Sequence, residues 1–359
     1  MRTTQLKFLS SCAVAVAALL GASAYAATVD GGGAAPAAVA ASAAAAPAAA
    51  APAASQSQVV LATSVVESAA AYAAYMERAG AIRPDYVNGQ GVAQALKIGQ
   101  GYEAKQLQQG MVGYAAMVAL RDPAFVNQLR VYAADPRMRE AIAANLLADP
   151  NYVAAIPGVD SAAGLVVGAL NAQGQRVNAA GKAVKQSAYD IQHQKWSLAT
   201  VANREARLIQ AKTDSTTPMV VTDADRSRVI SIPTGQAGFQ GASIPGPYTP
   251  SVAKGLALAA LAVLGKAGEE SVGQLSFLLV NKQDGFCFNM SKLNLYQCLS
   301  VAKPHYEDVF CLGQHVLLDT AQCVMKSAGT PYSNAPLAAS VMTAVAPVTA
   351  ASQAPTSQR

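Results

Sequence analysis

The sequence predicts an all-α protein: a bundle or stack of short helices, followed by a helical hairpin closed by disulfides. Three observations lead to this class. Apolar residues recur at three- and four-residue spacing through most of the chain, which is typical of amphipathic helices. Asp-Pro pairs, which begin helices, recur at intervals of one short helix. Four cysteines lie symmetrically about one proline, as expected for two antiparallel helices, and strand signals are sparse.

Residues 1–26 have the three parts of a secretory signal peptide. Arg2 and Lys7 make the start positive, residues 8–20 form an apolar run, and residues 24–26 read Ala-Tyr-Ala, a small-x-small cleavage site. The apolar run is shorter than the ~20 residues that a membrane-spanning helix needs. We therefore expect this segment to be removed, and the mature protein to lie in the periplasm, at the cell surface or outside the cell.

The letters "LSSC" at residues 9–12 also fit a lipoprotein signal. However, the apolar run follows Cys12 instead of preceding it, so cleavage there would leave the run on the mature protein. Simple export is the preferred interpretation. Cys12 then leaves with the signal, and the mature chain keeps an even set of four cysteines, whose default fate in an oxidising compartment is disulfides.

Composition divides the mature chain into segments. Residues 27–56 are mostly Ala and Pro, which predicts a disordered linker, and residues 331–359 predict a disordered tail. Between them we expect a helical domain at 57–212, a linker rich in Pro, Gly and Thr at 213–250, and a second helical domain at 251–330 that contains the four cysteines.

Helix starts in the first domain are indicated by Asp122-Pro123, Asp135-Pro136 and Asp149-Pro150. An Asp side chain accepts hydrogen bonds from the free N–H groups of a first turn, and Pro fits the first helical position. Helices of about ten residues are marginal alone, so they must pack against one another. Residues 158–217 lack proline, which leaves room for two longer helices.

The linker and the second domain carry two further local signals. Residues 229–232 suggest a short strand. Residues 256–264 form an apolar run that is too short to cross a bilayer, so we interpret it as a buried helix. No transmembrane segment is expected in the mature chain.

Two cysteine pairings are considered for the repeats "FCFNMSKLNLYQC" and "FCLGQHVLLDTAQC". Nested pairs, Cys298–Cys311 and Cys287–Cys323, are both centred on Pro304, where one helix is expected to stop and the next to start. Antiparallel helices bring together residues that are equidistant from their turn, so the nested pairing is favoured. Cys287 and Cys298 share one helix stripe, whereas the twelve-residue step from Cys311 to Cys323 lies about 120° off it and counts against the arrangement.

The rival pairing joins Cys287 to Cys298 and Cys311 to Cys323. Within one helix these atoms are roughly 16–18 Å apart, beyond the ~7 Å Cα limit of a disulfide. This pairing would need a turn inside "FNMSKLNLYQ", which contains neither Gly nor Pro. Crossed pairs and free thiols stay open as well.

No metal site or other cofactor is expected. His305 and His315 lie among the cysteines. However, zinc sites usually place two ligands with two to four residues between them, whereas ten to twelve residues separate consecutive cysteines here. We expect both histidines to be exposed on helix surfaces.

Catalytic motifs are weak. The motif S-x-x-K, which acylating penicillin-binding enzymes use, occurs at residues 251–254 and 300–303, but no K-T-G follows and no G-x-S-x-G elbow is present. We interpret both copies as helix-end residues. The chain is expected not to be an enzyme.

Positive charge gathers in residues 176–212. The formal net charge of +5 falls to +3 when Arg2 and Lys7 are removed, and this segment alone carries +5 because Asp190 and Glu205 are its only acidic residues. Its basic residues are Arg176, Lys182, Lys185, Lys195, Arg204, Arg207 and Lys212. They form a possible surface for an anionic partner, namely lipid head groups, a surface polymer or an acidic envelope protein. The alternative is a solvated helix face, and export argues against nucleic acid.

These features favour an exported, non-catalytic structural or interaction protein of the bacterial cell envelope or surface. The alternative is a periplasmic helical carrier for an apolar or lipid-like ligand, because helices rich in Ala can leave cavities. An exported hydrolase is the third hypothesis.

Overall fold

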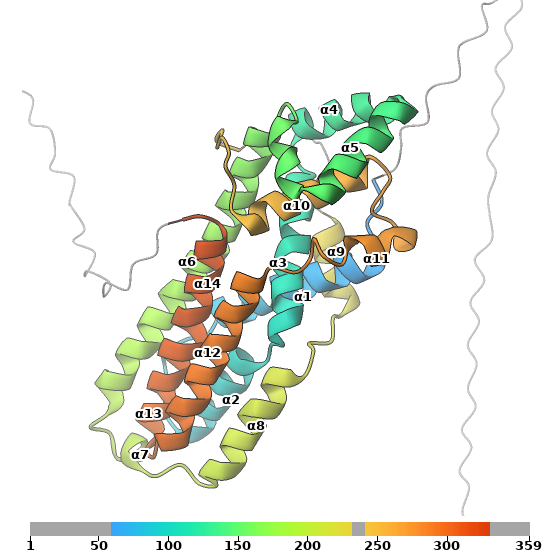
Figure 1. The fold of residues 1–359 in the computed structure, drawn as a ribbon. Helices are drawn as coiled ribbons and strands as arrows, with labels where there is room; N and C mark the ends of the chain where they lie inside the picture. Colours follow the sequence, from blue (N-terminus) through green and yellow to red (C-terminus); the bar gives the residue numbers. More distant parts are fainter. Residues whose placement is uncertain (1–58, 232–240, 331–359) are drawn as a thin grey trace, which may run out of the picture. The chain divides into compact units, whose positions relative to one another are not determined.

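The computed structural model describes residues 59–231 and 241–330, and every regular element in these ranges is a helix (Figure 1). The predicted all-α class is therefore confirmed. The predicted signal peptide, linker and tail at 1–26, 27–56 and 331–359 lie outside the described residues.

The first and third helices approach closely where small residues of one meet the backbone of the other. The first three helices are α1 (Thr63–Gly80), α2 (Gly89–Gln100) and α3 (Ala104–Ala119). Helices α1 and α3 lie against each other, and a Cβ on Gly110 of α3 would come 2.1 Å from the Ser68 carbonyl oxygen of α1. Any side chain at Gly110 would push the two backbones apart, so the Ala and Gly of this region permit the close packing.

The Asp-Pro pairs begin three consecutive elements, α4 (Pro123–Ala134), α5 (Pro136–Ala148) and the 3₁₀ turn η1 (Pro150–Ala155). Asp122 accepts from the backbone N–H of the third helical residue of α4, Asp135 from the first two free N–H groups of α5, and Asp149 from the first turn of η1. These are the helix caps that the sequence predicts.

The predicted buried helix is α10 (Pro250–Val263), and residues 256–263 have no measurable exposure. It lies against α3, η1 and α4 (Figure 1). A helix that is apolar on every side is stable in water only when neighbours surround it. None of the helices in the described ranges is long and apolar enough to cross a membrane.

The proline-free region folds as one long helix and two shorter ones: α6 (Val159–Ile191), α7 (Lys195–Leu198) and α8 (Arg204–Thr216). The short strand predicted at 229–232 is wrong, because Val229 and Ile230 end helix α9 (Asp223–Ile230). A capping box between Thr222 and Asp225 begins this helix, and that local signal outweighs the β-branched residues at its end.

The C-terminal region is the predicted helical hairpin. Its elements are η2 (Glu269–Ser271), α11 (Val272–Leu275), α12 (Lys282–Val301), α13 (His305–Cys311), the π-helical segment η3 (Leu312–Leu318) and α14 (Asp319–Ser327). Pro304 stands at the start of α13, at the bend between the two arms. Figure 1 shows α12 and α14 side by side, with α6 along α14.

Helices from both predicted helical domains, 57–212 and 251–330, contribute to one hydrophobic cluster. Helix α10 packs against α3, and α14 packs against α6. The segment 213–250 contains the end of α8 and all of α9. The predicted boundaries describe segments that fold independently. Independent folding is a separate property from shared packing, so this division of the chain stays a prediction.

Candidate functional site

Two disulfides join the arms of the hairpin in the nested arrangement. Cys287 is bonded to Cys323 and Cys298 to Cys311, and in each pair the two Cα atoms are 5.7 Å apart. One bridge lies near the bend and the other about three helical turns farther along α12. The two arms are therefore linked at two points, which prevents them from sliding or separating.

The twelve-residue step from Cys311 to Cys323 is accommodated by the π-helical segment η3, which lies between them. A π-helix closes hydrogen bonds five residues apart instead of four, so it inserts an extra residue without turning the rest of the helix to another face. Twelve residues of the second arm thus match eleven residues of α12. Gly313 of η3 also permits close contact, since a Cβ there would meet the Lys185 backbone nitrogen of α6 at 2.6 Å.

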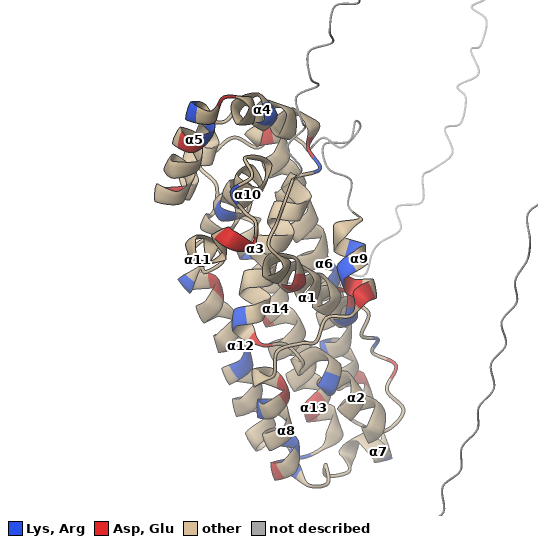
Figure 2. Ribbon diagram, turned by 90° about the vertical axis from the view of Figure 1, so that its right-hand side faces the viewer, with Lys and Arg blue, Asp and Glu red and all other residues tan. Residues whose placement is uncertain are grey.

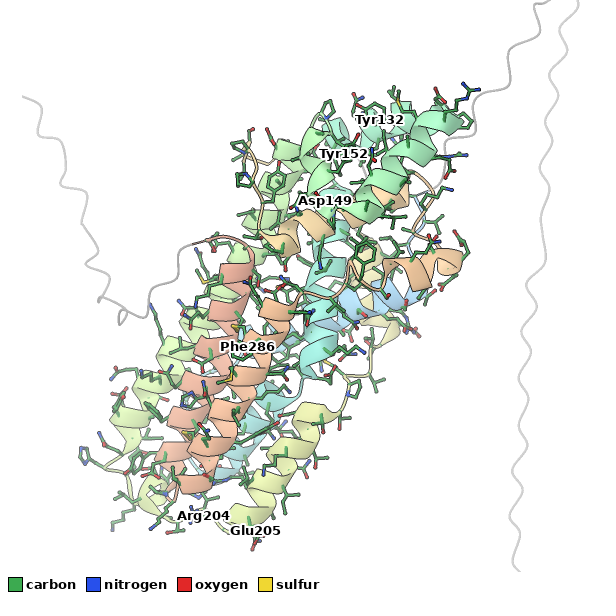
Figure 3. All side chains as sticks on the ribbon, in the orientation of Figure 1. Tyr132, Asp149, Tyr152, Arg204, Glu205 and Phe286 are labelled. Atoms are coloured by element: carbon green, nitrogen blue, oxygen red, sulfur yellow. A yellow bond between two sulfur atoms is a disulfide. The ribbon has the colours of Figure 1, made fainter. Side chains whose placement is uncertain are left out.

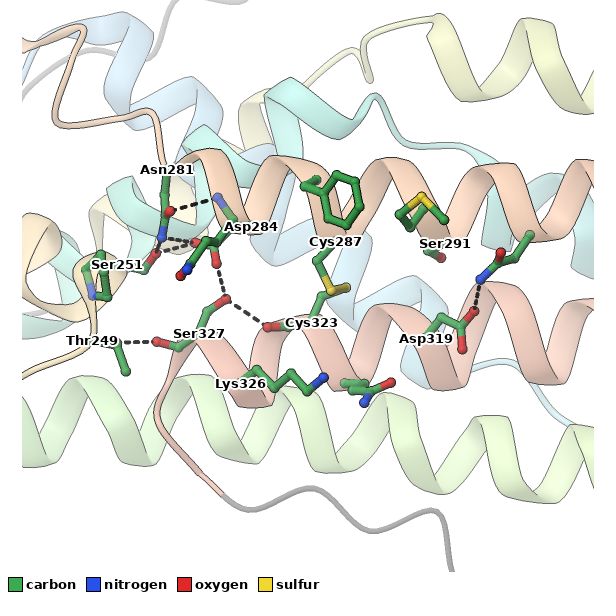
Figure 4. Close-up of a pocket in the computed structure, with 16 residues that line it drawn as sticks. Thr249, Ser251, Asn281, Asp284, Cys287, Ser291, Asp319, Cys323, Lys326 and Ser327 are labelled. Carbon is green, nitrogen blue, oxygen red and sulfur yellow. Dashed lines mark hydrogen bonds between the residues drawn. A yellow bond between two sulfur atoms is a disulfide. The ribbon is translucent and has the colours of Figure 1, made fainter.

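A cleft of about 470 Å³ lies beside the Cys287–Cys323 bridge, between α12 and α14 (Figure 4). Phe286 and Met290 form its apolar rim, and Phe286 is 68% exposed (Figure 3). Polar groups line the remainder. Figure 4 shows Ser251, Asn281 and Asp284 at one end of the cleft and Asp319 at the other. We take this cleft, together with the exposed face of α12, as the candidate functional site.

The first polar end is a buried cluster that ties three helices together. Asp284 of α12 accepts hydrogen bonds from the hydroxyls of Ser251 in α10 and Ser327 in α14, and from the Asn281 side-chain amide at 3.0 Å. Burial raises the pKa of the Asp284 carboxyl, and these hydrogen bonds oppose the rise. The cluster fixes the end of the cleft, because moving α10 or α14 would deprive a buried carboxylate of one of its donors.

The other polar end is built on Asp319. Its carboxylate accepts from the Asn294 amide at 3.1 Å and faces the His315 ring, with 3.2 Å between Nδ1 and Oδ2. The Ser291 hydroxyl donates to the His315 backbone carbonyl oxygen at 2.6 Å and not to its ring. The cleft therefore offers an apolar rim with hydrogen-bonding groups at both ends, an arrangement suited to binding.

The S-x-x-K copies occupy helix ends and do not pair as a catalytic unit. Ser251, in the first turn of α10, donates to Asp284, whereas the Lys254 ammonium donates to the carbonyl oxygens of Phe277 and Val280. Ser300, in the last turn of α12, donates to the Gln297 carbonyl oxygen. In both copies the serine hydroxyl is bonded elsewhere.

Two arginines of the basic segment cap the end of α12. The Arg204 guanidinium donates to the carbonyl oxygens of Ala302 at 2.7 Å and Ser300 at 3.0 Å, and Arg207 donates to that of Leu299. The last carbonyls of a helix have no partners within it and carry the negative end of its dipole, so a cation there is stabilising. Figure 3 labels Arg204 at this end of the molecule.

Arg207 also forms a buried ion pair with Asp308 of α13, whose side chain is 3% exposed. Burial raises the pKa of Asp308 to about 6, although Arg207 opposes the rise. The pair therefore connects α8, the end of α12 and the second arm of the hairpin.

The other basic residues of the segment differ in their contacts and in their exposure to solvent. Lys185 donates to the Gln314 side chain at 2.8 Å and lies 5.5 Å from the centre of the Phe310 ring. Lys182 is half-buried, and the exposed members are Arg176, Lys195 and Lys212. Figure 2 shows basic and acidic segments interspersed over the described helices. A surface for an anionic partner stays a prediction, and its candidate residues are now the three exposed ones.

Lys292 is a buried cation that the sequence analysis missed. It is 7% exposed, donates to the carbonyl oxygens of Tyr102 and Ser215, and its ammonium lies 3.9 Å from the centre of the Tyr102 ring. Burial lowers the pKa of Lys292 to about 7. Its position was a usable signal: Lys292 lies four residues after Phe288 and three before Leu295, both buried, so it is on the apolar stripe of α12.

His305 and His315 are not exposed surface residues, so the prediction for these two histidines is wrong. His305 is half-buried near Trp196, with 6.2 Å between ring centres, and it lies against Gly89 of α2. The His315 side chain is 24% exposed beside Phe310 and Asp319. Both are covered because α13 and η3 are packed on several sides by helices distant in sequence. Among the described residues, no group of three His, Cys, Asp or Glu side chains is placed to hold a metal ion.

Comparisons of this chain with protein-family models, with curated proteins and with solved structures found no match.

Proposed function

We propose that this chain is an exported, non-catalytic interaction protein of the bacterial cell envelope or surface, and that it binds a partner protein through α12. Export is supported by the signal-like residues 1–26 and by the two disulfides, which persist in oxidising compartments. The partner is an envelope protein that presents apolar side chains.

The observation that carries this proposal is an exposed apolar face on a helix that is held rigidly. Phe286, Leu293 and Val301 are 68%, 45% and 71% exposed. With Met290 they follow one another at three- to eight-residue steps, so they share one face of α12. Contiguous apolar groups on a protein surface mark interaction sites more often than isolated ones do.

Rigidity favours binding at this face. A helix that is already fixed loses little conformational freedom when a partner docks, so more of the contact energy appears as affinity. The Asp284 cluster holds the start of α12 in place, and Arg204 and Arg207 hold its end. Between them, the two disulfides attach α12 to the second arm of the hairpin.

The direct test is site-specific photocrosslinking in intact cells of the producing organism. A benzophenone side chain is introduced in place of Phe286 or Leu293, and in control variants in place of Val220 or Val87, which are 84% and 76% exposed in loops away from α12. We expect a discrete adduct from the two α12 positions only. Equal adducts from the control positions, or none from any position, would contradict the proposal.

The anionic-partner prediction needs a gentler test than removal of residues 176–212, because that deletion would take away the arginines that cap α12. Lys195→Glu with Lys212→Glu reverses two exposed charges and leaves Arg204 and Arg207 in place. If the partner is acidic, the adduct at Phe286 should fall at low salt and return toward that of the unmodified protein at high salt, where the repulsion is screened. An unchanged adduct would remove these lysines from the interface.

A further inference from the structure

A second pocket lies at the other end of the hairpin and is lined by residues at the ends of α6 and α12 and by residues of α13. Figure 1 shows these helix ends beside α13. It has a volume of about 430 Å³, within the range of small-molecule sites. The Cys298–Cys311 bridge forms part of its wall. Because this bridge holds α12 and α13 together, the pocket is formed before any ligand arrives.

The lining is mostly aromatic and aliphatic. Tyr189, Tyr306 and Phe310 contribute rings, and Tyr189 and Phe310 meet edge to face with 6.2 Å between ring centres. Ala302 and the 71% exposed Val301 complete the apolar surface. Aromatic walls of this kind prefer a flat aromatic guest, which can stack against one ring and meet the edge of another.

Two polar side chains in the pocket set the charge of that guest. Glu307 accepts from the Lys303 backbone N–H through Oε2, at 2.7 Å, which leaves Oε1 as an acceptor. Gln192 supplies an amide. A carboxylate beside an apolar guest favours a hydrogen-bond donor and repels an anion, so fatty acids and other carboxylates fit poorly.

We infer that this pocket binds a small aromatic molecule that is not an anion and carries a hydrogen-bond donor, such as an aryl amine or a phenol. The inference goes beyond the proposed protein interaction, because it concerns a separate pocket, which shares only Val301 with the α12 face, and a different class of ligand. It would make the chain a carrier or sensor of such molecules in addition to its role as a docking protein.

The test uses two matched fluorescent probes with the oxidised full-length mature protein. N-phenyl-1-naphthylamine is neutral and has one N–H donor, and 1-anilinonaphthalene-8-sulfonate is the same skeleton with an added negative charge. We expect saturable binding of the neutral probe at one site and binding of the anion at least about tenfold weaker, about 1.4 kcal/mol.

Three variants assign the site. Tyr189→Ser removes one ring from a residue that is already half exposed, and should weaken the neutral probe about tenfold. Glu307→Gln keeps an acceptor for the Lys303 backbone N–H and removes the negative charge. It should therefore make the affinities for the neutral and the anionic probe nearly equal. Phe286→Ser lies on the other apolar surface and should change neither.

Several outcomes would overturn the inference: no saturable binding of the neutral probe, equal affinities for both probes in the unmodified protein, or loss of binding in Phe286→Ser. The last result would place the probe on the face proposed for the partner protein. Failure of the crosslinking experiment would leave the binding constants of this pocket unaffected, so the two proposals can fail separately.

Discussion

The region of α4, α5 and η1 and the hairpin of α12 to α14 keep short helices folded by different means. In the first, Asp-Pro pairs cap each helix within its own first turn, and α5 buries only Ile142, Ala143 and Leu146. In the second, two disulfides, a buried lysine and a buried ion pair join helices that are distant in sequence. The polar contacts of the first region are mostly local, apart from the bond between Asp122 and Ser161 of α6, whereas those of the hairpin are mostly long-range.

This difference favours the hairpin as the place for the proposed binding surface. Local caps stabilise each helix separately, so they do little to fix one helix against another. The cross-links and buried polar groups of the hairpin fix the arms relative to each other and to α8. A surface that must present apolar side chains in constant positions is therefore expected on the hairpin.

The largest expected effect is that of the disulfides. Cys287→Ala with Cys323→Ala opens a loop with a sequence separation of 36, and Cys298→Ala with Cys311→Ala one with a separation of 13. The chain-entropy relation gives losses of about 4 and about 3 kcal/mol in the free energy of unfolding. Urea denaturation of the oxidised proteins measures both. A loss below about 1 kcal/mol for the longer loop would mean that packing alone holds the arms.

The next largest effect is a pH dependence of the free energy of unfolding, which we expect from Lys292. Its pKa is about 7 in the folded protein and near the ordinary 10.5 when unfolded, so between these pH values the unfolded state binds more protons. The free energy of unfolding should therefore rise with pH from about 7 to about 10, by a few kcal/mol. Lys292→Met should flatten this slope, whereas Lys326→Met, on an exposed part of α14, should keep it. A slope equal in all three proteins would show that the Lys292 ammonium is solvated.

Asp308 should produce a smaller dependence of opposite sign. Its pKa of about 6 exceeds the ordinary 3.8, so the folded state binds the proton more tightly. The contribution of Asp308 to stability is full below pH 4 and declines as the pH rises from about 4 to about 6, by on the order of 1–3 kcal/mol. Asp308→Asn should remove this decline, and Glu205→Gln, at an exposed carboxyl of α8, serves as the control. An Asp308→Asn profile that keeps the decline would assign it to other carboxyls.

The smallest effects are expected at the caps, where two aspartates can be compared directly. Asp122 is fully buried and accepts from both the Phe125 N–H at 2.9 Å and the Ser161 hydroxyl of α6, whereas Asp135 accepts only from the first turn of α5. Asp122→Ala should cost about 2 kcal/mol and Asp135→Ala about 0.5–1 kcal/mol. Thermal or urea unfolding distinguishes them, and equal losses would mean that the bond to Ser161 adds nothing.

Sequence reasoning succeeded where the cause of structure is local or symmetric. The Asp-Pro starts and the centring of both cysteine pairs on Pro304 were readable because each depends on neighbours or on the geometry of one turn. The capping box of Thr222 and Asp225 is an equally local signal, and it outweighs the β-branched residues that follow it.

What the sequence did not reveal depends on contacts between distant segments. In the sequence, the only sign of the π-helical segment is the twelve-residue step from Cys311 to Cys323. For a regular α-helix that step argues against the nested pairing. Arg204 and Arg207 looked like part of a basic surface, because nothing near them in the chain shows that the end of α12 lies beside them. The aromatic pocket likewise requires residues from three helices.

The central claim is that an exported chain presents α12 on a hairpin locked by nested disulfides. A non-reducing peptide map of the mature protein, recovered from the periplasmic and extracellular fractions, tests it most directly. The account predicts a chain that begins at Ala27, with peptides of Cys287 linked to those of Cys323 and peptides of Cys298 linked to those of Cys311. A protein that retains residues 1–26 inside the cell, four free thiols, or a bridge from Cys287 to Cys298 would contradict it.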